Sequence, residues 1–344
     1  MMAIFAGPFP PPVHGKALAT VALRDALLAE GVELRTIDIS EGARRGVAKA
    51  VHKLASHLAA IIEAARHAGP VYISVNSGGG MWLTTLLAGC ARLLGRPLIL
   101  HHHSYDYVGE RRSRMVVLAR AAGPQAVHLV LGQAMASDLA SSTPEVGRTA
   151  VLGNAGLIDP ALMELPKSKS GLVLGHLSNL SAEKGIAEVV ETAIALQSKG
   201  RPVRLVIAGP DGDDAARSAI DHGRQQLGDA LDYRGPVSGA AKRRFFADIS
   251  HFLFPTRYRN EASPLVLLEA VAAGVPCIAF ARGCIAEDLG TTGGVTVAIE
   301  EDFVAEAVSW LSQEWPQLRP RDRYLELLGA YRRQLDGVVR LMAD

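Results

Sequence analysis

Cysteine is scarce in this chain of 344 residues, which contains only Cys90, Cys277 and Cys284. Their spacing fits neither a zinc site nor a disulfide framework, so we expect three small core residues. So little cysteine is typical of a protein kept in a reducing compartment, and we expect a cytoplasmic location.

The chain also lacks an excess of charge of either sign, and it lacks long apolar runs. The 36 Lys and Arg residues nearly balance the 35 Asp and Glu residues, which leaves a net charge of +1 and suggests no nucleic-acid partner. No segment offers the roughly 20 apolar residues needed to cross a bilayer. The start, residues 1–8, lacks a charged region and a long apolar run, so we expect no signal peptide.

What the chain does contain is a regular alternation of short apolar runs and helical patterns. Its length exceeds that of a usual single core, which predicts two domains. The alternation predicts parallel sheets covered by helices, with helices at residues 16–30 and 81–94 among them. Strands are expected at residues 3–6, 33–39, 71–76, 97–102, 172–177, 203–208, 232–233, 252–254, 275–280 and 295–299.

The periodicity falters after Gly153 and through residues 159–170, which is the expected linker. The chain is therefore predicted to be an α/β protein with two doubly wound parallel-sheet domains facing a cleft. We expect one domain at residues 1–160, a second at 161–315, and a helical tail at 316–344 that packs back on the first. Ligands of such folds bind at the carboxyl ends of the strands.

Two spaced glutamates are the most informative feature. Ser263 is expected to cap a helix, Pro264 to take its first position and Gly274 to end it. Glu261 then stands in the preceding loop, and Glu269 lies about two turns further along. At a rise of roughly 1.5 Å per residue, both carboxylates fall within the span of one nucleotide sugar. The alternative is a glutamate favoured by the helix dipole plus an ordinary surface glutamate.

Three loops could approach a phosphate. Lys184 stands beside an expected helix N-terminus, where a positive charge opposes the helix dipole unless an anion is also bound. A diphosphate would satisfy both, and a solvated lysine is the alternative. Gly15, and Gly79 with Gly80, precede other expected helices, and glycine lets the backbone N–H groups come close. Neither glycine loop matches a P-loop or a GxGxxG motif.

His101 and His103 follow a buried-looking strand, and strand alternation places them on the same side. No cysteine or carboxylate accompanies them at a metal-ligand spacing, so we expect no metal and a neutral histidine that hydrogen-bonds a sugar hydroxyl. The acidic run at residues 211–214 resembles a cation-binding triplet. Because it precedes a helix, where acidic residues are common caps, we interpret it as structural.

Several short motifs in the second half occur together. They are Glu183-Lys184-Gly185, Ala208-Gly209-Pro210, Gly235-Pro236-Val237, Phe254-Pro255-Thr256, the two glutamates, and the runs at residues 269–276 and 283–287. With them the chain resembles a family 4 glycosyltransferase of the GT-B fold. The resemblance covers nearly the whole chain and is strongest from Leu172 to Glu287.

This resemblance implies two Rossmann-like domains, an acceptor-side domain first and a nucleotide-sugar-binding domain second. The implied activity is retaining, metal-independent sugar transfer from a UDP-, GDP- or ADP-linked donor, without a cofactor. Relatives with Asn-Glu-Ala before the second glutamate are similar to enzymes of bacterial surface-polysaccharide assembly. The implied acceptor is therefore lipid-linked or a glycan.

The resemblance also implies roles for single residues. Glu261 would hold donor sugar hydroxyls, Glu269 the ribose, Lys184 the diphosphate, the backbone near Val237 the base, and His103 the sugar near the reacting centre. The remaining candidates are Gly15, Asn179, Ser263, Pro264 and Leu265 for donor binding, and His101, Gly79 and Gly80 on the acceptor side.

Asn179 is a departure from the family pattern, because many relatives have an arginine five residues before the lysine. One positive charge that would face the diphosphate is therefore absent. Two alternatives stay open on this sequence: a nucleotide-sugar epimerase of the same fold, and a non-catalytic nucleotide-sugar-binding relative.

A basic, amphipathic segment covers residues 44–66. Val47, Val51, Leu54, Leu58 and Ile61 recur at helical spacing among lysines and arginines. Such a stripe usually faces a core, and the alternative is contact with an anionic membrane. The basic run at residues 111–114 adds modest support for the latter. On that hypothesis the protein would be peripheral at the inner face of the membrane.

Overall fold

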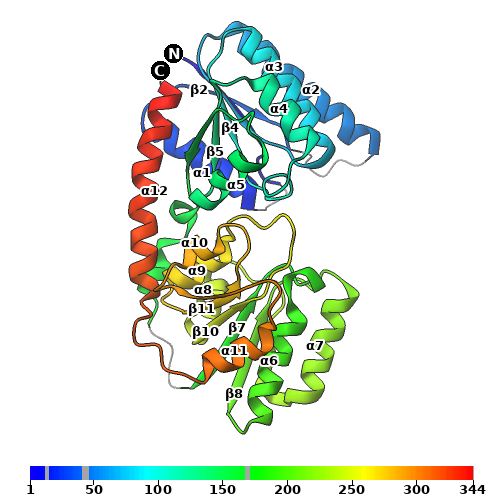
Figure 1. Ribbon diagram of the computed structural model, residues 1–344, viewed down its shortest axis with the longest axis vertical. Coiled ribbons are helices and arrows are strands. Elements are labelled where there is room, and N and C mark those ends of the chain that lie inside the picture. The colour runs from blue at the N-terminus through cyan, green and yellow to red at the C-terminus, as the bar shows by residue number, and fades with distance from the viewer. Residues whose placement is uncertain (12–14, 41–45, 167–170, 344) are drawn as a thin grey trace. The chain divides into compact units, whose positions relative to one another are not determined.

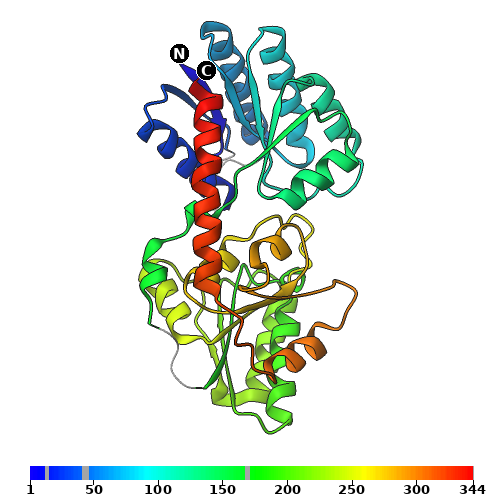
Figure 2. The ribbon, with the colours of Figure 1, turned by 60° about the vertical axis from the view of Figure 1, so that its left-hand side comes forward.

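The structure is a computed structural model that describes residues 1–11, 15–40, 46–166 and 171–343. Contacts divide the chain into two compact units: unit 1, Met1–Leu157 with Gly329–Asp344, and unit 2, Ile158–Leu328. The end of the chain therefore belongs with its beginning (Figures 1 and 2). Part of the expected linker, residues 167–170, lies outside the described residues.

Unit 1 contains a six-stranded parallel sheet of order β2-β1-β3-β4-β5-β6. Its strands are β1 (Ala3–Gly7), β2 (Leu34–Asp38), β3 (Val71–Ser74), β4 (Leu98–His101), β5 (Val127–Val130) and β6 (Arg148–Val151). Its helices are α1 (Gly15–Ala29), α2 (Gly46–Arg66), α3 (Met81–Leu93), α4 (Ser113–Ala122), α5 (Gln133–Ser142) and the end of α12 (Pro320–Ala343).

Burial in unit 1 follows strand position. The inner strands β1, β3, β4 and β5 are buried along their whole length, whereas the edge strands β2 and β6 are partly exposed. Inner strands of a parallel sheet are covered on both faces and therefore consist of continuous apolar runs. The polar His128 within β5 is accommodated because its Nδ1 lies 2.9 Å from Nε2 of the buried His102.

Unit 2 repeats the architecture with a parallel sheet of order β12-β11-β10-β7-β8-β9. Its strands are β7 (Leu172–Leu177), β8 (Val203–Ala208), β9 (Leu231–Tyr233), β10 (His251–Phe254), β11 (Cys277–Phe280) and β12 (Gly294–Val297). Its helices are α6 (Ile186–Ser198), α7 (Asp214–Leu227), α8 (Gly239–Asp248), α9 (Leu265–Ala272), α10 (Ile285–Leu289) and α11 (Phe303–Leu311).

The sheet order of unit 2 places two loops with predicted site residues together. β7 and β10 are hydrogen-bonded neighbours, with His251 opposite Leu174. Because parallel strands end at the same edge of the sheet, the loop after β7, which carries Lys184, lies beside the loop after β10, which carries Glu261. Helices α6 and α9 follow these loops, so their N-termini also lie at this edge.

The start of α9 differs by one position from the expectation. The helix begins at Leu265, with Pro264 at the N-cap and no side-chain cap. The N-cap is therefore Pro264 rather than Ser263, whose hydroxyl donates to Asp288 Oδ2 at 2.8 Å. Glu269 is thus the fifth residue of the helix, little more than one turn in. The predicted end is confirmed: Gly274 has a φ of +81°, in the left-handed region that glycine favours.

Helix α2 does not pack on unit 1 mainly through the apolar stripe identified in its sequence. Its buried residues are Ser56, His57, Ala60 and Ala64. Of the predicted stripe, Val47, Val51, Leu54 and Leu58 are exposed and Ile61 is half-buried. The core-facing interpretation of the stripe was therefore wrong. None of the described helices is both long and apolar enough to span a membrane.

Two smaller predictions have a clear outcome. Asp213 caps α7 by accepting from the Ala216 amide at 2.7 Å, which confirms the structural interpretation of the acidic run. Cys277 and Cys284 are buried, as expected for core residues, whereas Cys90 is half-buried.

Candidate functional site

An ion pair between Lys184 and Glu261 forms the centre of the candidate site in unit 2. The Lys184 ammonium donates to Glu261 Oε2, and the two side chains are only 17% and 13% exposed. Thr256 Oγ1 donates to the same carboxylate oxygen at 3.3 Å. The Lys184 Nζ also lies 4.5 Å from the ring centre of Tyr258, within the range of a cation–π contact.

The backbone around Lys184 is held tightly against the neighbouring loop. Gly185 has a φ of +77°, and a Cβ at this position would overlap the Pro255 carbonyl oxygen. The Arg257 amide donates to the Glu183 carbonyl at 2.7 Å. Only glycine satisfies both the backbone conformation and the close approach, which explains its place directly after the lysine.

The second glutamate has its own cation. Glu269 Oε1 accepts from Lys242 Nζ on α8 at 2.8 Å, and the Glu269 side chain is 12% exposed. Burial raises the pKa of Glu269 above its ordinary value, and the nearby Lys242 opposes this rise only in part. The site therefore contains two acidic side chains, each paired with a lysine from a different element.

A third segment fixes the loop that carries Glu261. Arg282 Nε donates to the Tyr258 carbonyl at 2.6 Å, and the Cys284 amide donates to the Ala262 carbonyl at 2.7 Å. The hydrogen bond from Ser263 to the buried Asp288 adds a side-chain contact. Burial raises the pKa of Asp288 to about 7, and the hydrogen bond from the Ser263 hydroxyl opposes this rise only in part.

The other donor-side candidates of unit 2 lie in loops or at helix starts. Asn179 is exposed in the loop after β7, and Val237 is half-buried between β9 and α8. Pro264 and Leu265 form the start of α9. The first amides of a helix lack acceptors within the helix, so this start offers N–H groups to an anion.

The glycine candidates of unit 1 lie at helix starts. Gly15 is the exposed first residue of α1, and Gly79 and Gly80 belong to a short 3-10 turn (η1, Gly78–Gly80) before α3. The side chain of Lys16 was missed: its ammonium donates to the Val75 carbonyl at 2.7 Å. Burial, with a smaller effect of Lys53, lowers the pKa of Lys16 to about 7.

The histidine candidates differ in exposure. His101 is 2% exposed, and its Nδ1 lies 2.8 Å from the Tyr72 hydroxyl. Burial, with a smaller effect of Lys16, lowers the pKa of His101 to about 3, so its ring is neutral near pH 7. His103 is half-buried, with its ring centre 3.9 Å from that of His101. Of the two, His103 is the more accessible to a ligand.

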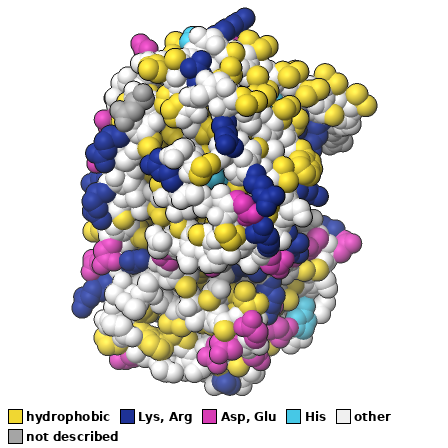
Figure 3. Space-filling model, turned by 45° about the horizontal axis from the view of Figure 1, so that its top comes forward, with side chains coloured by type: hydrophobic (Ala, Val, Ile, Leu, Met, Phe, Trp, Pro, Cys, Tyr) yellow, Lys and Arg dark blue, Asp and Glu magenta, His cyan; other side chains and the backbone are white. Residues whose placement is uncertain are grey.

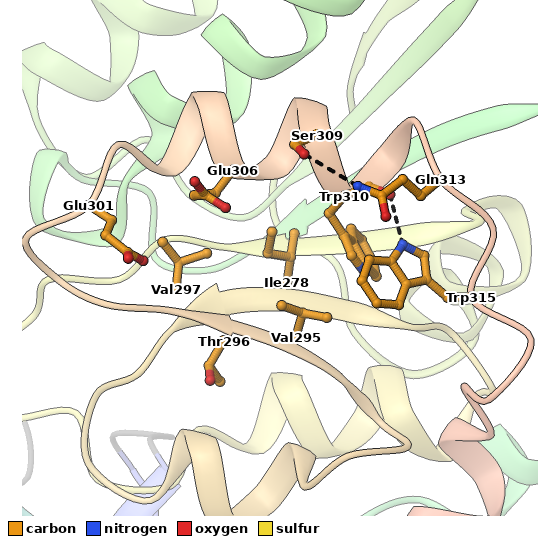
Figure 4. A pocket seen from close by; sticks show the side chains of 10 residues that line it. All are labelled: Ile278, Val295, Thr296, Val297, Glu301, Glu306, Ser309, Trp310, Gln313 and Trp315. Atoms are coloured by element: carbon orange, nitrogen blue, oxygen red, sulfur yellow. Dashed lines mark hydrogen bonds between the residues drawn. The ribbon is translucent and has the colours of Figure 1, made fainter.

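A pocket in unit 2 lies away from these residues (Figure 4). It lies against β11, the edge strand β12, and α11 with the segments on either side of that helix. Its lining residues are Ile278, Val295, Thr296, Val297, Glu301, Glu306, Ser309, Trp310, Gln313 and Trp315. None of the predicted site residues contributes to it. Among the described residues, no group of three or more His, Cys, Asp or Glu side chains is arranged to hold a metal ion.

Several partners in the site could not be found from sequence patterns. Lys242, Thr256 and Asp288 contact the predicted residues across 27, 5 and 25 positions respectively. Thr256 was noted only within a motif, and Lys242 stands in an ordinary basic helix. Such contacts depend on the tertiary fold and have no fixed spacing.

Comparisons with known proteins show what the chain is similar to. Residues 171–314 match the family described as "Glycosyl transferases group 1". An alpha-D-kanosaminyltransferase from Streptomyces kanamyceticus is 27% identical over 257 residues, which cover 67% of this chain and 65% of the relative. The chain thus spans just under two thirds of that relative's length.

Solved structures resemble the fold over nearly its whole length. The Anabaena protein HepE in complex with UDP-glucose has a TM-score of 0.70 at 15% identity, covering 98% of this chain and 99% of that one. Sucrose-phosphate synthase from Thermosynechococcus elongatus has a TM-score of 0.71 at 18% identity, covering 98% of each chain. These likenesses confirm the predicted two-domain fold.

Proposed function

We propose that this chain, a GT4-like glycosyltransferase with the GT-B fold, transfers a sugar from a nucleotide-sugar donor with retention of configuration. The observation that carries the proposal is the Lys184–Glu261 ion pair at the carboxyl edge of the unit 2 sheet, beside the starts of α6 and α9. It offers a cation for a diphosphate and a carboxylate for sugar hydroxyls within one small volume.

The donor is proposed to exchange partners with the ion pair. Lys184 turns from Glu261 to the diphosphate, and Glu261, oriented by Thr256, accepts from hydroxyls of the sugar. Each charged group thereby gains a new partner when it loses the old one, which avoids leaving a charge buried and unpaired. Glu269 exchanges Lys242 for the ribose hydroxyls in the same way.

Cleavage of the sugar–phosphate bond leaves negative charge on the departing diphosphate. Preorganised donors must meet this charge as it develops. Lys184 and the first amides of α6 and α9 supply them, and the exposed Asn179 adds no positive charge. The proposed chemistry needs neither a metal ion nor a cofactor, because lysine and helix N-termini take over the stabilisation of the leaving group.

The proposed donor is a UDP-, GDP- or ADP-linked hexose, and the proposed acceptor is lipid-linked or a glycan, in polysaccharide or glycoconjugate biosynthesis. UDP and UDP-glucose are bound by HepE, a structural neighbour of low sequence identity. A UDP-linked hexose is therefore the first donor to test.

The test is a donor panel with and without acceptors, read by nucleotide release and by mass spectrometry of the product. Transfer of a hexose to an acceptor, with the anomeric configuration retained, supports the proposal. Free epimerised sugar nucleotide without acceptor would assign an epimerase instead. Donor binding without turnover over a broad acceptor panel would assign a non-catalytic binding protein.

A further inference from the structure

The Lys184 ammonium lies against two aromatic rings as well as against the Glu261 carboxylate. Its Nζ is 4.5 Å from the ring centre of Tyr258 and 5.8 Å from that of Phe254. Both distances are within the roughly 6 Å over which a ring face attracts a cation. Because the Lys184 side chain is only 17% exposed, water weakens this attraction little. The nearer ring, that of Tyr258, therefore helps to hold the ammonium in the site.

Several hydrogen bonds fix Tyr258 itself. Its carbonyl accepts from Arg282 Nε at 2.6 Å and from the Glu261 amide at 3.0 Å. Its amide donates to Thr256 Oγ1 at 3.2 Å, and its hydroxyl accepts from Asn260 Nδ2 at 3.0 Å. The backbone and the tip of the ring are both anchored, so the ring keeps its place when a neighbouring side chain moves.

The ion pair supplies the ammonium with a single hydrogen-bond acceptor. An ammonium has three N–H donors, but among the described residues only Glu261 Oε2 accepts from Lys184 Nζ. In the proposed reaction the donor sugar takes over Glu261, and the ring faces are the contacts that remain until the ammonium meets the diphosphate. A lysine side chain that turns out to solvent regains up to about 2 kcal/mol of rotamer freedom, which favours its leaving the site. The Tyr258 ring opposes this movement.

The surface of unit 2 gives the ammonium little help in attracting an anion. Where Figure 3 shows this unit, acidic and basic side chains are interspersed rather than gathered by sign. Asn179, in the loop before Lys184, adds no positive charge. Capture of a diphosphate therefore depends strongly on where the Lys184 ammonium lies before the donor arrives.

We propose that Tyr258 is a positioning residue for sugar transfer. Its ring face holds the Lys184 ammonium in the site while the donor displaces Glu261, so that the ammonium meets the diphosphate already oriented. Tyr258 thereby reduces the reorganisation that stabilisation of the leaving group requires. This role deepens the proposed function and rests on it, because it is exerted through Lys184.

The experiment compares the turnover of the wild type, Tyr258→Phe and Tyr258→Leu, measured by nucleotide release. Phenylalanine keeps the ring face and loses only the hydroxyl, whereas leucine keeps an apolar side chain without a ring face. We expect Tyr258→Phe to retain turnover within about twofold. Tyr258→Leu should lose about fivefold, because a partly buried cation–π contact is removed.

Combination with Lys184→Ala separates a positioning role from a structural one. If Tyr258 acts through the ammonium, Tyr258→Leu has no further effect on turnover once Lys184 is replaced. A ring that only supports its loop would lower turnover by the same factor in both backgrounds. Equal losses in the two backgrounds would therefore overturn the inference. Wild-type turnover of Tyr258→Leu, or a loss in Tyr258→Phe as large as that in Tyr258→Leu, would overturn it as well.

A second measurement needs no sugar transfer. Reductive methylation with ¹³C-formaldehyde labels the lysine Nζ atoms and keeps their charge. The ring current of Tyr258 should displace the Lys184 methyl signal from that of the exposed Lys199, and Lys184→Arg assigns the signal. We expect Tyr258→Phe to retain this displacement and Tyr258→Leu to remove most of it.

The two measurements distinguish the two proposals. A Lys184 methyl signal without displacement in the wild type overturns the positioning role, even where sugar transfer is found. Absence of turnover by the wild type with every donor and acceptor overturns the proposed function, even where the displacement is found.

Discussion

Single residues of the site were foreseeable, but their partners were not. Glu261, Glu269 and Lys184 could be selected because helix signals and short motifs mark their positions in the sequence. Their pairing with one another or with Lys242 depends on which strands are neighbours. Residue types and local motifs can be identified in the sequence. The contact between Lys184 and Glu261, which are 77 positions apart, depends on the tertiary fold.

Replacement of Lys184 tests the role of the single ammonium. Lys184→Ala should reduce turnover by at least about tenfold, or roughly 1.4 kcal/mol, because it removes the cation proposed to stabilise the leaving diphosphate. Nucleotide release is the measurement, and Lys199→Ala, at the exposed C-cap of α6, the helix that follows Lys184, is the matched control. Wild-type turnover by a folded Lys184→Ala protein would contradict the assignment.

Asp288 makes stability depend on pH. Its pKa is raised by burial to about 7, so between about pH 4 and pH 7 the folded protein holds a proton that the unfolded chain releases. This contribution is fully present below the unfolded pKa and is lost as the pH rises through about 7. It amounts to roughly 4 kcal/mol at most.

Asp288→Asn should remove this dependence. The free energy of unfolding of the wild type, relative to that of the variant, is expected to fall between pH 4 and pH 7. Urea unfolding at several pH values measures it, with Asp229→Asn at an exposed position as the control. Parallel pH profiles for the wild type and Asp288→Asn would show that this carboxyl group does not titrate in the fold.

Elements were predicted best where a mostly apolar run of six residues forms a whole strand. β7 and β8 have the predicted bounds because each follows a glycine or a proline closely and stays mostly apolar, although His176 and Arg204 interrupt the runs. β5 and β6 were missed, since β5 is only four residues long and contains His128, and β6 is an exposed edge strand that begins with Arg148. The face that α2 buries was also not predictable, because small residues rather than large ones pack on the unit.

The two ends of α6 allow a matched test of loop packing. Gly185 and Gly200 both have positive φ, but only at Gly185 would a Cβ overlap a neighbouring backbone atom. Gly200→Ala should cost about 1 kcal/mol of conformational strain. Gly185→Ala should lower the free energy of unfolding by more, roughly 2–4 kcal/mol, because its Cβ would also overlap the Pro255 carbonyl oxygen. Urea unfolding measures both, and equal losses would mean that the loop after β10 yields easily.

At the scale of the whole molecule, each unit has its own parallel sheet and its own buried strands. Two such units were foreseeable from the length and from the alternation of strands and helices. All residues proposed to meet the nucleotide sugar most directly, Lys184, Glu261 and Glu269, lie in unit 2. A bound nucleotide is therefore expected to change amide hydrogen exchange mainly in unit 2.

Hydrogen exchange tests this localisation. A bound nucleoside diphosphate should slow amide exchange in the loops after β7 and β10, because a ligand stabilises the folded conformation to which it binds. The inner strands of unit 1 should exchange as before and serve as the internal control. Protection confined to unit 1 would contradict the assignment of the donor site to unit 2.

Calorimetric titration of the wild type and of Lys184→Ala with UDP-, GDP- and ADP-hexoses is the most direct test that the Lys184–Glu261 pair receives a nucleotide sugar. The account predicts heat with at least one of these donors, and an affinity at least about tenfold weaker in the variant. No heat with any donor, or equal affinities for both proteins, would contradict it.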